Sequence, residues 1–118
     1  MPDKEDVIRL KHMLDAARDV ISFTQNKTRS SLDTDKMLGF SLVRCIEIIG
    51  EAASKITKQS YDEFPQIPWK KIINMRNRII HAYYDINLDV VWSTITEDLP
   101  PLIVELEKII STEEGSKR

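Results

Sequence analysis

The sequence predicts an all-α protein that folds as an antiparallel up-and-down four-helix bundle. Apolar residues recur at three- and four-residue steps over four long stretches, which is the period of an amphipathic helix. No stretch shows the apolar–polar alternation of a strand, and short connections between long helices favour antiparallel neighbours. The 118 residues are about the size of one domain and hold no linker-like cluster, so we expect a single domain over residues 1–118.

The first two helices are predicted over residues 3–24 and 34–57, with a polar stretch between them. Asp3 offers an N-cap to the first helix, because its carboxylate can accept hydrogen bonds from free backbone N–H groups. Gly39 and Gly50 each cost the second helix up to about 1 kcal/mol relative to alanine. We therefore expect both glycines to mark places where another backbone packs closely.

The third and fourth helices are predicted over residues 68–84 and 88–109. The third helix begins at a proline, which suits a first turn because the N–H it lacks is not needed there. Inside the fourth helix, Pro100–Pro101 cannot donate backbone hydrogen bonds, so this helix should kink or divide near Asp98. The polar tail over residues 111–118 is expected to fray.

The composition excludes several classes of protein. Hydrophobic residues make up 42% and charged residues 31%, a balance that supports a globular fold. No apolar run approaches the roughly 20 residues needed to span a bilayer, and the N-terminus lacks the apolar core of a signal peptide. We therefore expect a cytoplasmic protein that does not enter a membrane. A single cysteine, Cys45, and two separated histidines give no zinc spacing, so we expect no metal site.

Positive charge is concentrated in one segment of an acidic chain. The formal net charge is −2, which argues weakly against a generic nucleic-acid coat protein. Pro65–Tyr84 holds no Asp or Glu and carries a formal +4, which leaves −6 for the rest. Such a segment can attract a phosphate, although on charge alone a solvated helix face is the better explanation. The four cations are Lys70, Lys71, Arg76 and Arg78.

Arg76 lies near the middle of the apolar face of the third helix, which is an unusual place for a guanidinium. An arginine there must be paired, reach out to solvent or line a cleft, because an unpaired buried charge is very costly. A structural salt bridge to Glu47 or Glu51 is one interpretation, and position alone slightly favours it. The face otherwise consists of Trp69, Ile72, Ile73, Ile79, Ile80 and Tyr83.

The neighbours of Arg76 favour a site. Asn77 and His81 are four residues apart on one flank of the helix, and Arg76 and Tyr83 are seven apart and nearly eclipsed. On an ideal helix, however, Arg76 and His81 are separated by about 140° of rotation and about 7.5 Å of rise. Either the helix distorts near Tyr84, or two copies of the chain assemble one cleft across a two-fold axis. We favour the second explanation.

The segment Arg76–Tyr83 resembles the Arg-x4-6-His signature of HEPN-domain ribonucleases, in the HepT form with Asn after Arg and Tyr two residues after His. Other segments are similar to the HepT-like family in order and spacing, so the resemblance extends over nearly the whole chain. These segments are Ile48–Ala53, Ile67–Trp69, Met75–His81, Val91–Trp92 and Thr96–Pro100.

The resemblance implies a HEPN-like homodimeric bundle that acts as a metal-independent endoribonuclease, the toxin of a type VII-like HepT/MntA toxin–antitoxin pair. It implies RNA as the substrate and no cofactor of the chain's own. The usual partner in this family is an MntA-like minimal nucleotidyltransferase, which can transfer AMP from ATP to the tyrosine of a His-x-Tyr element. Tyr83 is that position here, and ATP and magnesium belong to the partner's reaction.

The residue types fit this chemistry. RNA supplies its own 2′-hydroxyl nucleophile, so a metal-free site needs proton transfer and positive charge on the phosphorane. His81 suits the first role and Arg76 the second. Asn77 and Arg78 are expected to orient the imidazole or hold phosphates, and Lys70 and Lys71 are further candidates for RNA binding.

Two other functions fit the same residues. The bundle can be a non-catalytic binding or regulatory subunit of a minimal nucleotidyltransferase, with Arg76 and His81 contacting only its nucleotide. It can also be a purely structural dimerisation protein, which would tolerate Arg76→Lys or His81→Gln. An assay of the purified dimer on RNA separates these classes.

Overall fold

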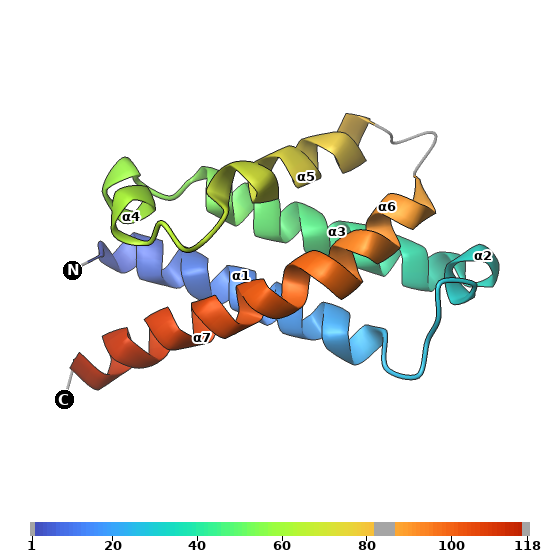
Figure 1. Cartoon of the computed structure of the whole chain (residues 1–118), viewed down its shortest axis with the longest axis horizontal. Coiled ribbons are helices and arrows are strands. Elements are labelled where there is room, and N and C mark those ends of the chain that lie inside the picture. The colour runs from blue at the N-terminus through green and yellow to red at the C-terminus, as the bar shows by residue number, and fades with distance from the viewer. Residues whose placement is uncertain (1, 82–86, 117–118) are drawn as a thin grey trace.

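The computed structural model describes residues 2–81 and 87–116, and the side chains of residues 78–81 and 116 lie outside that description. All regular structure in the described part is helical, which confirms the all-α prediction. Successive long helices run in alternate directions along the molecule (Figure 1). In chain order, the elements are α1 (Lys4–Phe23), α2 (Ser31–Thr34), α3 (Lys36–Ser54), α4 (Lys58–Glu63), α5 (Trp69–His81), α6 (Leu88–Ser93), the π-helix η1 (Thr94–Asp98) and α7 (Leu99–Ser116).

Side-chain caps fix where the first helices begin. The Asp3 carboxylate accepts a hydrogen bond from the N–H of Glu5 at 3.4 Å, which confirms the predicted cap of α1. Asp35 accepts from the N–H of Leu38 at 3.1 Å, so α3 begins at Lys36, two residues later than predicted. Thr57 caps α4 through the N–H of Ser60, so residue 57, the predicted end of the second helix, instead starts a new one.

The short helices α2 and α4 are absent from the prediction. Each is too short and too polar to show a hydrophobic period, so their existence depends on contacts. The hydroxyl of Tyr61 in α4 donates to the carbonyl of Ala53 at 2.6 Å, and its ring packs against Trp69 with the centroids 5.0 Å apart. Helix α4 is thereby attached both to the end of α3 and to the start of α5.

Asp6 connects α4 to the first helix from a fully buried position. Its carboxylate accepts from the Thr57 hydroxyl at 2.5 Å, the Thr57 N–H at 3.2 Å and the Ser60 hydroxyl at 2.7 Å. Burial alone would raise the pKa of Asp6, but these hydrogen bonds and the charge of Arg9 outweigh it and lower the pKa below the ordinary 3.8. The resulting stabilisation is therefore present above about pH 3.8 and is lost as the pH falls through the lowered pKa.

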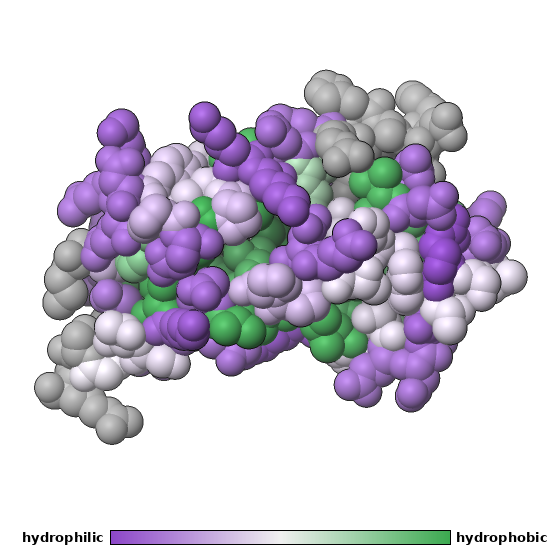
Figure 2. All heavy atoms as spheres, in the orientation of Figure 1, coloured by the Kyte–Doolittle hydropathy of each residue, from purple (hydrophilic) through white to green (hydrophobic). Residues whose placement is uncertain are grey.

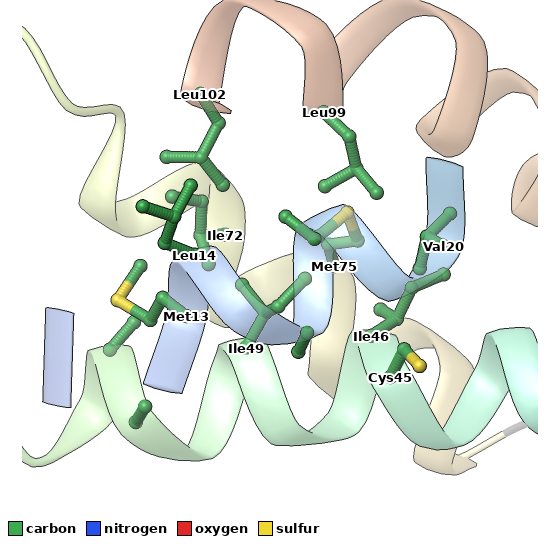
Figure 3. Packing of buried hydrophobic residues seen from close by; sticks show 14 of the residues in the cluster. Met13, Leu14, Val20, Cys45, Ile46, Ile49, Ile72, Met75, Leu99 and Leu102 are labelled. Carbon is green, nitrogen blue, oxygen red and sulfur yellow. The ribbon is translucent and has the colours of Figure 1, made fainter. Parts of the chain in front are cut away.

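The core lies where α1, α3, α5 and α7 meet. Apolar side chains from these four helices point toward one another in Figure 3. The residues labelled in Figure 3 are Met13, Leu14 and Val20 of α1, Cys45, Ile46 and Ile49 of α3, Ile72 and Met75 of α5, and Leu99 and Leu102 of α7.

No helix in residues 2–81 and 87–116 is long and apolar enough to cross a membrane.

The last helical stretch divides where the prolines predict. The N–H of Leu99 donates to the carbonyl of Thr94, five residues back, and the π-helix η1 ends at Asp98. A proline ring collides with the carbonyl four residues before it and offers that carbonyl no N–H. The wider π turn immediately before Pro100–Pro101 relieves both problems, since its carbonyls are displaced from α-helical positions.

The prediction that the tail frays is wrong for most of its length, because α7 continues to Ser116. Lys11 of α1 forms an ion pair with Glu114 at 3.3 Å, and the Thr112 hydroxyl donates to the carbonyl of Lys108 at 2.9 Å. These contacts with α1 and within the helix keep the tail helical, although its own residues are polar.

Candidate active site

Helix α5 carries the Arg-x4-His segment, Arg76–His81, and is held in place at its first turns. The indole N–H of Trp69 donates to the carbonyl of Phe64 at 3.0 Å, and the N–H of Ile72 donates to Pro68 at 3.0 Å. Ile72 and Met75 are buried in the core. The helix packs beside α3 and runs antiparallel to it, so one face of α5 is fixed against α3 (Figure 1).

The side chain of Arg76 crosses α3 at Gly50. A Cβ added to Gly50 would overlap the Cβ of Arg76 and come within 2.8 Å of its Cδ and 2.9 Å of its Cγ. Gly50 therefore does mark a close approach, as predicted, but what approaches is the side chain of the motif arginine and not another backbone. The same prediction for Gly39 is wrong within this chain, because nothing described lies within 4 Å of a Cβ placed there.

The guanidinium of Arg76 has no structural partner among the described residues. The residue is half-buried, and its Nε is buried without a hydrogen bond. Glu47 and Glu51 are engaged by Arg44 instead, at 3.3 and 3.9 Å. The salt bridge considered from the sequence is therefore not formed. A half-buried cation without a carboxylate partner is well suited to bind an anion.

A polar stripe runs along the exposed side of α5. Lys70 and Asn77, both predicted as auxiliary groups, are exposed, and so is Asn74 between them. Asn74 is not among the residues predicted from the sequence, although its position four residues after Lys70 and seven before His81 places it on the same helical line. An amide there adds a second neutral hydrogen-bonding group next to Asn77.

Lys71 points to a different neighbour. Its ammonium forms an ion pair with Asp98 of η1 at 2.8 Å, and the hydrogen bond and charge of Asp98 raise the pKa of Lys71. Its positive charge is thereby partly compensated on the side of α5 that faces η1. A role for Lys71 in RNA binding stays a prediction.

Of the remaining motif residues, Arg78 and His81 belong to the last turn of α5. His81 is its last residue, and the side chains of His81 and Arg78 are outside the described part. Tyr83 lies in 82–86, also outside it. Helix α5 remains α-helical from Trp69 to His81, so the distortion that would bring Arg76 and His81 together does not occur within these residues.

A hollow of about 410 Å³ lies on another side of α5. Apolar side chains show in the groove between α5 and α7 (Figure 2). Ile72, Met75 and Leu99 line the hollow together with the Lys71–Asp98 pair, whereas Arg76 and Asn77 do not. Because the hollow excludes the motif arginine, we take the α3–α5 surface around Arg76 as the candidate site.

Within residues 2–81 and 87–116, no three His, Cys, Asp or Glu side chains gather in a way that could hold a metal ion.

Comparison with known proteins agrees with the motif. The family model described as ribonuclease HepT-like matches residues 13–109. A Methanocaldococcus jannaschii protein that carries the name "Putative RNase" is 36% identical over 115 residues, which cover 98% of this chain and 95% of that protein. The "Probable ribonuclease HepT" of Thermococcus cleftensis is 34% identical over 100 residues, 85% of this chain and 91% of that protein. No solved structure matches significantly.

The family match spans most of the chain, including α3, α5 and the whole Arg-x4-His segment. It confirms the prediction that the enzyme is of the endoribonuclease class. We conclude that the chain belongs to the ribonuclease HepT-like family.

Proposed function

We propose that this enzyme is a metal-independent endoribonuclease that acts as the toxin of a type VII-like toxin–antitoxin pair. The observation that carries the proposal is the environment of Arg76. Its stem is seated on Gly50, its Nε is buried without a partner, and the nearest glutamates of α3 are paired with Arg44. The charge of this guanidinium has no carboxylate partner among the described residues, so a phosphate can supply the counter-charge, and the names of the relatives support RNA as the source of that phosphate.

The proposed reaction needs only groups of the chain and of RNA. The 2′-hydroxyl gives its proton to a base and its oxygen attacks the adjacent phosphorus. The bond from phosphorus to the 5′-oxygen breaks, and the leaving 5′-oxygen takes up a proton from an acid. His81 is assigned the proton transfer, and Arg76 stabilises the extra negative charge of the phosphorane. The products are a 2′,3′-cyclic phosphate and a 5′-hydroxyl. Asn77, Lys70 and Asn74 are assigned contacts to neighbouring phosphates.

We place the active site between two copies of the chain. In a regular α-helix, Arg76 and His81 are separated by about 140° and about 7.5 Å, so one copy presents them to different directions. A two-fold axis beside α5 would bring the arginine of each copy toward the histidine of its partner. The homodimer therefore completes the site in this proposal.

The direct test is cleavage of RNA by the purified chain in excess EDTA. We expect cleavage at the same rate with and without the chelator, and products that end in 2′,3′-cyclic phosphate. An all-deoxy strand of the same sequence is the control and should stay intact, because it lacks the nucleophile. Cleavage of the deoxy strand would contradict the mechanism. Absence of RNA cleavage would favour the regulatory subunit of a nucleotidyltransferase instead.

We further propose that an MntA-like nucleotidyltransferase neutralises the enzyme by transferring AMP from ATP, with magnesium, to Tyr83. The nucleotide would occupy space that the RNA substrate needs beside α5 and would place a phosphate near Arg76, where it would compete with the RNA phosphate for the positive charge. Tyr61 is a poor acceptor by comparison, because its hydroxyl already donates to Ala53 and burial raises its pKa.

Mass spectrometry after incubation with the partner, ATP and magnesium tests this regulation. The unmodified chain should gain the mass of one AMP and lose RNase activity. Tyr83→Phe removes only a hydroxyl, so it should remain active and gain no mass. An adduct on Tyr61 or Tyr84, or full activity of the modified chain, would contradict the proposal.

A further inference from the structure

A second hollow, of about 320 Å³, lies between α2, the first half of α3 and the start of α6. An aromatic side chain, Phe40, stands at its rim with 65% of its surface exposed. Lys36 lies one helical turn before Phe40 and Arg44 one turn after it, and both cations are exposed. The hollow is lined by Leu32, Asp33, Lys36, Gly39, Phe40, Val43 and Leu88.

Gly39 lines the hollow and contributes no side chain to fill it. A glycine inside a helix costs stability relative to alanine, and nothing described lies within 4 Å of a Cβ placed at Gly39. No packing contact within the described chain therefore explains the missing side chain. By contrast, Gly50 in the same helix is explained by Arg76. The absence of a side chain at Gly39 leaves space in the hollow that a bound ligand could occupy.

We propose that this hollow binds a base of the RNA strand, stacked on Phe40, while Lys36 and Arg44 contact the flanking phosphates; this rests on the proposed ribonuclease function. Stacking on an aromatic ring between cations is a common way to hold single-stranded RNA. The carboxylate at the rim, Asp33, is compensated by Arg29 at 3.0 Å.

The charges around Arg44 do not prevent this role. Arg44 pairs with Glu47 at 3.3 Å and Glu51 at 3.9 Å, but its own side chain is 61% exposed. Both ion pairs are made by the same nitrogen, Nη1, so a phosphate can bind the other N–H groups of the guanidinium while the glutamates stay paired. Among residues 2–81 and 87–116, no carboxylate forms an ion pair with Lys36.

The hollow lies on the path that the proposed active site defines. Helices α3 and α5 are antiparallel (Figure 1). A Cβ placed at Gly50 would meet the side chain of Arg76, so these two residues mark where the helices approach each other closely. From Gly50, α3 extends back to Gly39 over about 16 Å, in the same direction in which α5 runs from Arg76 to His81. A strand that follows α5 from Arg76 toward its end therefore also runs along α3 in the direction of Gly39 and the hollow.

The test uses two variants of the full-length protein, Phe40→Ala, which removes the stacking surface, and Gly39→Leu, which fills the hollow. We expect each to raise KM for a single-stranded RNA of ten or more nucleotides by about tenfold, within the range for losing one stacked base. Neither should change kcat by more than about twofold, and cleavage of a dinucleotide should be unaffected. Phe40→Tyr should restore the original KM, because it keeps the ring.

Matched controls separate this effect from general damage. Gly115→Leu makes the same change at another helical glycine with open space around it, and Ile8→Ala removes an exposed apolar side chain from α1. Both should leave KM unchanged. Thermal unfolding by circular dichroism checks that each variant is folded at the assay temperature.

Other outcomes overturn the inference in distinguishable ways. If the unmodified protein cleaves RNA and the Phe40 and Gly39 variants match the controls, the hollow does not bind RNA although the proposed function stands. If these variants become monomeric in sedimentation, the patch instead contacts a second copy of the chain. If the unmodified protein does not cleave RNA, the proposed function fails. Fluorescence anisotropy with a labelled RNA strand then tests separately whether the hollow binds RNA. If Phe40→Ala binds the strand as tightly as the unmodified protein, the hollow does not bind RNA.

Discussion

Replacing Arg76 or His81 by alanine is expected to lower kcat/KM for RNA cleavage by at least about a hundredfold. That is the low end for losing an acid–base group or a charge that stabilises the transition state. Initial rates on a fluorogenic RNA measure the effect. His12→Ala and Arg18→Ala are the matched controls, because they remove an exposed histidine and an exposed arginine from α1.

Mixing the two inactive variants tests whether the site is shared between copies. In a heterodimer of Arg76→Ala and His81→Ala, one of the two Arg–His pairs formed across the two-fold axis would be intact, with the arginine from one copy and the histidine from the other. Co-refolding the two chains should therefore recover a substantial part of the activity. If the mixture stays as inactive as each variant alone, while sedimentation confirms that heterodimers form, the two residues act within one copy and the proposed assembly is wrong.

Gly50→Ala is expected to reduce kcat for RNA cleavage by about a hundredfold, although Gly50 itself touches no substrate. The new Cβ would overlap the stem of Arg76, so the arginine must move or α3 and α5 must separate. A displacement of about 1 Å in a catalytic group can cost about a hundredfold in rate. Gly50 is thus a positioning residue, and the loss should appear mainly in kcat and only weakly in KM.

A stability measurement shows whether Gly50→Ala loses activity because Arg76 is displaced or because the protein unfolds. Overpacking costs about 1–3 kcal/mol, partly offset by the gain of about 1 kcal/mol from placing alanine in a helix. Urea unfolding of Gly50→Ala should therefore show a small net loss. Gly39→Ala, the same change in the same helix without a neighbour, should gain about 0.5–1 kcal/mol. Full activity in Gly50→Ala would show that the close contact does not position Arg76.

Much of the fold follows from local properties of the chain. The spacing of apolar residues predicts the long helices, and the Asp3 carboxylate predicts the start of α1. Pro100–Pro101 predict that the last helical stretch is interrupted, as it is by the π-helix η1. Each of these depends on residues within a few positions of one another. The short helices α2 and α4 do not, since they need partners far along the chain, such as Asp6 for α4.

The candidate site divides in the same way. The sequence alone determined which chemical groups are present and their spacing on one helix: a guanidinium at Arg76, an imidazole at His81 and a phenol at Tyr83. Only the tertiary structure decided which of the cations are available, because pairing depends on neighbours from other helices. Asp98 compensates Lys71 and Arg44 occupies the glutamates of α3, whereas Gly50 admits the stem of Arg76 and leaves its Nε without a partner.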